Sequence, residues 1–196
     1  IINFSFWIFY NYIPNSYSLE RNFIFLFLNL IVLLVVIPGF FYTLIYNSPF
    51  YNEDRLIELF LTKPLFNIFS LTGINSVYEG NTISFVDSQG HIRKVWIAAQ
   101  CSGIFSVQIF VAAFISFVLL ELNLKDFSTL IFLFLGLFLC YIANIFRMFI
   151  IILVGYYFGM EALAQTHAYA GWLIFTFWMT IFWYFISKNI DIPYNR

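Results

Sequence analysis

The chain is poor in charge. Only 9 Lys and Arg and 10 Asp and Glu occur among 196 residues, whereas 62% of the residues are hydrophobic. A soluble domain usually has roughly 45–50% apolar and about 25% charged residues. A single core of this size cannot hide so much apolar surface, whereas a bilayer can solvate it. The net charge of −1, without a basic stripe, argues against a nucleic-acid partner.

Cysteine and histidine are equally scarce. The chain has two cysteines, Cys101 and Cys140, and two histidines, His91 and His167. They follow no metal-ligand spacing, so we expect neither a metal nor another cofactor. One disulfide is possible by count, but the cysteines lie in different contexts: Cys140 stands inside an apolar run and is expected to pack there. His91 is interpreted as an ordinary solvent-facing residue.

Long apolar runs predict an all-α polytopic membrane protein with about four to six transmembrane or interfacial helices in one domain, residues 1–196. The expected spans are residues 23–46, with a kink at Pro38-Gly39, and residues 104–120, 127–158 and 168–186. Residues 55–71 carry charges and Pro64, which favours an interfacial helix-turn. Residues 1–13 lack a basic start and a cleavage site, so a signal peptide is not expected.

A β-hairpin interrupts this helical pattern at about residues 73–99. Two alternating runs, residues 82–86 and 92–96, flank Asp87-Ser88-Gln89-Gly90, which is typical of a turn. Because an open two-stranded edge cannot lie in lipid, we expect the hairpin outside the hydrocarbon or covered by protein. The catalytic core is expected to follow it, at about residues 100–187.

Threading the three spans that follow the hairpin places three polar residues at one membrane face. Cys101 precedes the first of these spans, and His167 precedes the third. Arg147 lies about 20 residues into the second, roughly 30 Å along a helix, so it returns to the side of the hairpin. The counts of Lys and Arg in the loops do not decide which face this is. An ordered hairpin favours the outward face.

Cys101 stands at the start of an expected helix. Unpaired backbone N–H groups and the positive end of the helix dipole stabilise a thiolate there, so we expect a lowered pKa and a nucleophile. The alternative is a small buried cysteine with a packing role. Both readings stay open on position alone.

Arg147 and His167 supply the other parts of an acyl-transfer site. An ionisable residue inside a span marks a functional site by default, although snorkelling to headgroups is the alternative for Arg147. Asn144 lies on the same helix face. Arg147 is suited to stabilise an oxyanion or to bind a carboxylate or phosphate, and His167 to act as base and acid. Alone, His167 would more often be an interfacial residue.

The ordered motifs around these residues resemble the exosortase/archaeosortase family: Gln100-Cys101-Ser102-Gly103, Asn144-Ile145-Phe146-Arg147 and His167-Ala168-Tyr169-Ala170-Gly171-Trp172. The resemblance implies a membrane-embedded cysteine protease or transpeptidase of the prokaryotic cell membrane, with an extracytoplasmic active site. By the resemblance, Cys101 is the nucleophile, and Arg147 and His167 are its catalytic partners. We expect supporting or substrate-binding roles for the remaining polar and motif residues, namely Asn144, Ser102, Gly103, Gln100 and Trp172.

The implied substrates are membrane-anchored secreted proteins with a C-terminal sorting tail: a signature, an apolar span and a basic cluster. Cleavage through a thioester would pass the protein to a lipid or amine acceptor, or to water. Two alternatives remain: a non-enzymatic scaffold or export factor for envelope assembly, and an acyltransferase that uses the same cysteine. A transporter is disfavoured because no polar relay lies at mid-membrane depth.

Overall fold

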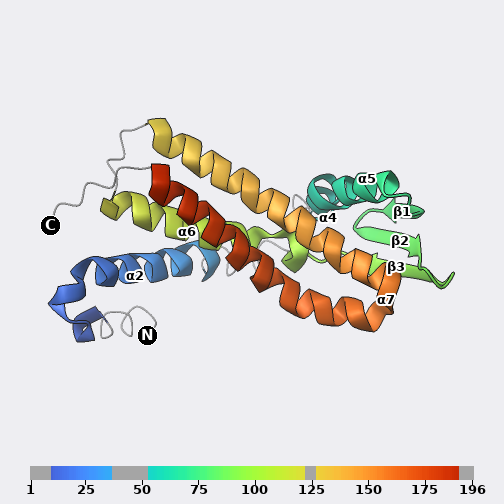
Figure 1. The fold of residues 1–196 in the computed structure, drawn as a ribbon, viewed down its shortest axis with the longest axis horizontal. Helices are drawn as coiled ribbons and strands as arrows, with labels where there is room; N and C mark the ends of the chain where they lie inside the picture. The colour runs from blue at the N-terminus through green and yellow to red at the C-terminus, as the bar shows by residue number, and fades with distance from the viewer. Residues whose placement is uncertain (1–9, 37–52, 122–126, 190–196) are drawn as a thin grey trace. The chain divides into compact units, whose positions relative to one another are not determined.

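The computed structural model describes residues 10–36, 53–121 and 127–189, and these are mostly helical (Figure 1). The chain divides into two compact units. The first comprises Ile1–Asn47, Phe105–Phe138 and Ile181–Arg196; the second comprises Ser48–Ile104 and Leu139–Thr180. The expected kink at Pro38-Gly39 and the loop before residue 127 lie outside the described residues. That the whole chain is one transmembrane domain stays a prediction.

The first unit is built from apolar helices. It contains α2 (Ser18–Ile31), which continues into the π-helical turn η2 (Val32–Val36), and nearly all of α6 (Ile104–Glu121). On α6, Phe110 packs edge-on against Phe182 at a centroid distance of 5.0 Å. Gly136 makes room for the Phe110 ring, because a Cβ there would overlap it. The predicted helix at residues 104–120 is confirmed.

Two described helices are long and apolar enough to cross a bilayer. They are Ser18–Val36 and Ser128–Lys188, and the shorter helix Ile104–Leu120 is also apolar. The second candidate lies in α7 (Phe127–Asn189), which is broken at Gly159. A helix that ends near residue 158 is therefore confirmed, and its passage through a membrane stays a prediction. The following helix begins directly after Gly159, before residue 168, and a membrane span that starts at residue 168 stays a prediction.

In the second unit the two arms of α7 run antiparallel. Gly159 has φ 87° and ψ 177°, a conformation that only glycine adopts without strain. On either side of this break, an ideal Cβ at Gly155 would lie 2.5 Å from Leu163 Cδ1, and one at Gly171 would lie 3.5 Å from Arg147 Cζ. These two contacts show that the arms face each other along their length.

A helical run also covers part of the second unit. It consists of α4 (Glu53–Ile57), a π-helical turn η3 (Glu58–Thr62) and α5 (Lys63–Leu71). Pro64 lies in the first turn of α5, directly after the π-helical turn. Buried side chains recur at every fourth position and form one face of the run: Ile57, Leu61, Leu65 and Phe69. The expected helix-turn is thus a continuous helical run, and its interfacial location stays a prediction.

A three-stranded antiparallel sheet completes the second unit. Its strands β1 (Ser76–Glu79), β2 (Thr82–Val86) and β3 (Ile92–Trp96) are ordered β1-β2-β3. The β2–β3 hairpin is confirmed with the expected strands, but the expectation of two strands is wrong, since β1 adds a third. Ile83 and Phe85 are 0% and 2% exposed and join the core with Met148 of α7.

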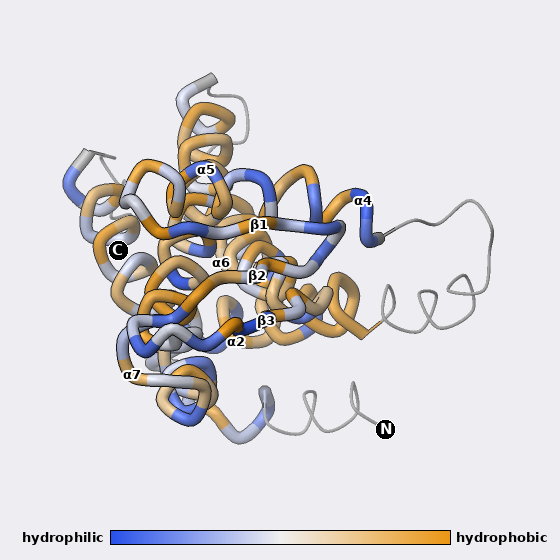
Figure 2. The backbone as a smooth tube through the Cα atoms, turned by 90° about the vertical axis from the view of Figure 1, so that its right-hand side faces the viewer, coloured by the Kyte–Doolittle hydropathy of each residue, from blue (hydrophilic) through white to orange (hydrophobic). Residues whose placement is uncertain are grey.

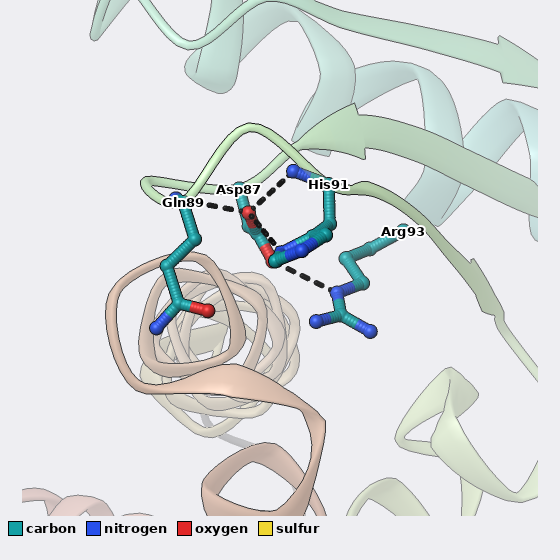
Figure 3. Close-up of polar contacts among 4 residues, drawn as sticks. All are labelled: Asp87, Gln89, His91 and Arg93. Atoms are coloured by element: carbon teal, nitrogen blue, oxygen red, sulfur yellow. Dashed lines mark hydrogen bonds and ion pairs between the residues drawn. The ribbon is translucent and has the colours of Figure 1, made fainter.

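Asp87 fastens the tip of the β2–β3 hairpin (Figure 3). Its Oδ1 accepts the backbone N–H groups of Gln89 (3.0 Å) and His91 (2.8 Å), and its Oδ2 accepts Arg93 Nε–H (2.8 Å). The hydrogen bond from Arg93 is the largest cause that lowers the pKa of Asp87 to about 2. His91 Nδ1 lies 3.5 Å from Asp87 Oδ1. The histidine is therefore exposed, as expected, but not without a partner.

Replacing Asp87 with asparagine should loosen the hairpin. An amide keeps the shape but loses the charge-assisted bond to Arg93. Because folding lowers the pKa of Asp87, its contribution is present above about pH 4 and is lost as the pH falls toward 2. We expect amide exchange in β2 and β3 to quicken roughly tenfold at neutral pH, measured by hydrogen–deuterium exchange. Glu161→Gln, at an exposed position of α7, is the control; equal exchange in the two variants would contradict this role.

Candidate functional site: a cysteine turn against a helical hairpin

Cys101 lies in a tight turn between the sheet and α6. The turn η4 (Ala99–Ser102) follows β3 almost directly, and Cys101 N–H donates to the Ala98 carbonyl at 2.9 Å. Gly103 then adopts φ 82°. A Cβ at Gly103 would lie 2.7 Å from Asn144 Cγ, so glycine is required by both its conformation and its neighbour. This explains the glycine of the Cys-Ser-Gly motif.

Asn144 joins this turn to α7. Its Nδ2 donates to the Cys101 carbonyl oxygen at 3.1 Å, and its Oδ1 accepts Arg147 Nη1 at 3.5 Å. Asn144 is 7% exposed, so these bonds form away from solvent. Because residues three apart share a helix face, one turn of α7 holds both the cysteine backbone and the guanidinium. Asn144 therefore fixes the position of Arg147 relative to the thiol.

Arg147 has an unused hydrogen-bond donor. Its Nε is buried and has no hydrogen-bond acceptor among the described residues. Gly171 lies opposite, where a Cβ would be 3.6 Å from that Nε, so the second arm leaves the guanidinium uncrowded. A buried donor without an acceptor is uncommon and costly in proteins. It suits a site that receives an oxygen acceptor from outside.

His167 approaches the thiol from the second arm of α7. Its Nε2 lies 4.0 Å from Cys101 Sγ, close enough for a weak sulfur hydrogen bond whose direction depends on the tautomer. His167 is exposed, whereas Cys101 is only 8% exposed. The structure thus brings Cys101, Asn144, Arg147 and His167 together in one unit. Their catalytic roles stay predictions.

The resting thiol is less acidic than its position suggested. Burial raises the pKa of Cys101, and this effect outweighs the nearby Arg147 charge and the backbone hydrogen bond with Ala98, which both lower it. The expectation of a lowered pKa is therefore wrong. The physical reason is desolvation: the cysteine lies in the core of the second unit, where a thiolate loses its hydration.

Alkylation of Cys101 should report this balance. In a Cys140→Ala background, we expect the rate of modification by a soluble maleimide to rise with pH. The pH at which this rate is half-maximal should lie above the pKa of an exposed cysteine, which is about 8.5. Arg147→Gln should move that midpoint to still higher pH, because it removes the charge that favours the thiolate. Arg147→Lys should restore it. A midpoint that shifts down in Arg147→Gln would contradict this assignment.

The other residues expected at the site do not lie beside the Cys101 thiol. Gln100 and Ser102 are exposed, and Ser102 Oγ accepts the N–H of Ile104 at a long 3.4 Å. Trp172 is 58% exposed and follows His167 by five residues, so it points to another side of the arm and is not brought to the thiol. Gly171 was not expected at the site. Its spacing of four from His167 was the signal, because such residues share a face.

Neither cysteine forms a disulfide, and Cys140 is 3% exposed in the interior of α7. Within the part of the chain that the structure describes, no group of three or more His, Cys, Asp or Glu side chains could hold a metal ion.

Fold and site together define a protein with apolar helices of membrane length and a cysteine, a histidine and an arginine at one place. The family model described as transmembrane exosortase (EpsH) matches residues 16–184. The chain therefore belongs to the transmembrane exosortase family, and the resemblance of its motifs is confirmed. Members are generally cysteine transpeptidases, and membership supports a sorting-related function. No curated protein and no solved structure matches the chain.

Proposed function

We propose that this protein removes the C-terminal sorting tail of membrane-anchored secreted proteins and transfers them through a thioester to an acceptor. The observation that carries the proposal is the 4.0 Å approach of His167 Nε2 to Cys101 Sγ. A base beside a thiol is the minimal arrangement for a sulfur nucleophile. Arg147, linked to the same turn through Asn144, supports the assignment.

The raised pKa of Cys101 favours proton transfer during the reaction over a preformed ion pair. His167 Nε2 takes the thiol proton as Cys101 Sγ attacks the scissile carbonyl carbon, which gives a tetrahedral intermediate with a negative oxygen. The guanidinium of Arg147 stabilises that oxygen. The C–N bond then breaks, and the imidazolium returns its proton to the departing amine, so a thioester remains on Cys101.

The second half of the reaction restores the enzyme. An acceptor amine, or water, attacks the thioester carbonyl while His167 removes its proton. The C–S bond breaks, the new amide or acid forms, and the proton returns to the Cys101 sulfur. No oxidant, reductant or metal is needed for this sequence.

We propose an extracytoplasmic site at the membrane surface. The substrate is itself tethered in the bilayer, which raises its effective concentration at a site of this depth. The lipid bilayer is thus a partner, and the acceptor is a lipid or another amine. The apolar helices support the membrane location, and the side of the active site rests on the family resemblance.

Hydroxylamine provides the test. The chain would be produced in membranes with a secreted protein of the same genome that ends in a signature, an apolar span and a basic cluster. We expect loss of the tail and, with hydroxylamine, a hydroxamate at the new C-terminus, because hydroxylamine intercepts a thioester. Mass spectrometry detects both changes. If every such protein keeps its tail, the proposed function is wrong; if a tail is lost without a hydroxamate, the thioester step is wrong.

A further inference from the structure

Strand β3 presents an open edge. The bonds Asp87 N–H to His91 C=O (2.9 Å) and Ile97 N–H to Asn81 C=O (2.8 Å) mark both ends of the β2–β3 ladder. Hydrogen-bonded pairs alternate with non-bonded pairs in an antiparallel ladder. With the observed register, the backbone groups of the alternate residues point away from β2: Ile92, Lys94 and Trp96. Within the described residues these groups have no hydrogen-bond partner.

The opposite edge of the sheet differs. α5 packs along β1, and the Phe66 and Tyr78 rings lie 5.0 Å apart. Figure 2 shows α5 on the β1 side of the sheet and β3 on the other side. Among the described elements, β3 is therefore the edge that an additional strand could pair with.

The β3 strand also leads toward the thiol. At the hairpin tip, Ser88 N–H donates to the Tyr156 carbonyl of α7 at 3.1 Å. At the other end, the Cys101 carbonyl accepts Asn144 Nδ2 at 3.1 Å. Tyr156 and Asn144 are about 18 Å apart along α7, so β3 runs beside the first arm from the hairpin tip to the site.

We propose that the substrate segment just upstream of the scissile bond binds as an extended strand along the open edge of β3. This proposal rests on the proposed function and specifies how its substrate is held. A chain that leaves a folded extracytoplasmic domain and enters the bilayer runs in the same direction as β3, so the added strand is parallel. Main-chain hydrogen bonds to Ile92, Lys94 and Trp96 hold it. The same segment becomes the acyl half of the thioester and stays paired until the acceptor arrives.

Disulfide mapping tests this geometry. In a Cys101→Ala, Cys140→Ala background, Ile92→Cys places a thiol on β3 (Ile92 is 74% exposed), and Val77→Cys is the matched control on β1 (70% exposed). Single cysteines are moved through roughly ten positions upstream of the cleavage site of the tail-bearing protein. After oxidation, we expect Ile92→Cys to cross-link at alternate positions only, because strand side chains alternate, and Val77→Cys to cross-link at none.

Proline supplies an independent readout. Lys94→Pro removes an outward N–H without disturbing the ladder with β2, and Ser76→Pro does the same at the outer edge of β1. We expect Lys94→Pro to slow tail removal at least about tenfold and Ser76→Pro to change it less than about twofold. Period-two cross-links with a slow Lys94→Pro support the strand. If wild-type protein removes the tail but cross-links are absent or consecutive, or if both proline variants are equally active, the strand is overturned. If wild-type protein removes no tail, the proposed function itself fails.

Discussion

Replacing Cys101 with alanine should abolish removal of the sorting tail, whereas replacing Cys140 with alanine should leave its rate close to that of the wild-type protein. Cys101 Sγ is the atom that His167 approaches at 4.0 Å, and alanine offers no nucleophile in its place. Loss of a nucleophile costs roughly a thousandfold or more in turnover. The measurement is the rate of tail loss in membranes, followed by gel mobility and mass spectrometry.

Cys140 makes this comparison sharp. It is the same residue type, it is buried, and it lies in α7, in the same unit as Cys101. A defect due to lost thiol packing would therefore appear in both variants, and size-exclusion chromatography in detergent checks that each remains folded. Tail removal by Cys101→Ala at the wild-type rate would exclude the thioester mechanism and favour a scaffold or export factor. Thioester transfer onto a lipid or glycan, without tail loss, would favour an acyltransferase.

Replacing Arg147 with lysine should reduce turnover by about a hundredfold or more, although the charge is kept. Arg147 uses Nη1 toward Asn144 and leaves Nε buried without an acceptor. The donors of a lysine ammonium all sit on one nitrogen, so lysine cannot contact Asn144 and also place a donor where Arg147 Nε lies. We expect the loss in the rate of the chemical step, measured as tail removal at saturating substrate.

Charge and shape can be separated at this position. Arg147→Lys should retain the alkylation profile of Cys101, which depends on charge, while it loses turnover, which depends on the fork of donors. Arg147→Gln should lose both. Lys63→Arg, where a salt bridge of 3.3 Å joins Glu58, is a matched exchange outside the site. Wild-type turnover in Arg147→Lys would show that the guanidinium acts only as a charge.

The sequence allowed some elements to be predicted to the residue. The β2–β3 hairpin was predictable because alternation and a four-residue turn are local signals. β1 was not, since Ser76–Glu79 is short and its pairing with β2 is set by tertiary contact. The helical stretch after Gly159 was missed for another reason. Residues 160–165 are good helix formers, but Glu161 and Gln165 interrupt the apolar run by which a membrane span is recognised.

The sequence predicted which residues form the site better than it predicted the protonation of Cys101. Spacing alone placed Cys101, Arg147 and His167 at one depth, because helix length converts residue number into distance. The protonation of Cys101 could not be predicted in this way. A helix start suggests an acidic thiol, whereas burial depends on which side chains close over it, and burial is the larger effect here. The spacing of Gly171 from His167 places both on one helix face, but only the structure shows that Gly171 lies opposite Arg147.

Because the break at Gly159 is a single residue, the position of His167 depends on the number of residues that separate it from Gly159. His167 and Arg147 belong to one helix folded back on itself, and no loop between the arms can absorb a change in length. One residue inserted after Gly159 would rotate every following side chain by about 100° and advance it by about 1.5 Å. His167 would then leave the thiol, and its neighbour would replace it. The arms of α7 should therefore tolerate substitutions more readily than insertions or deletions, because only a change in length moves His167 out of register with Cys101.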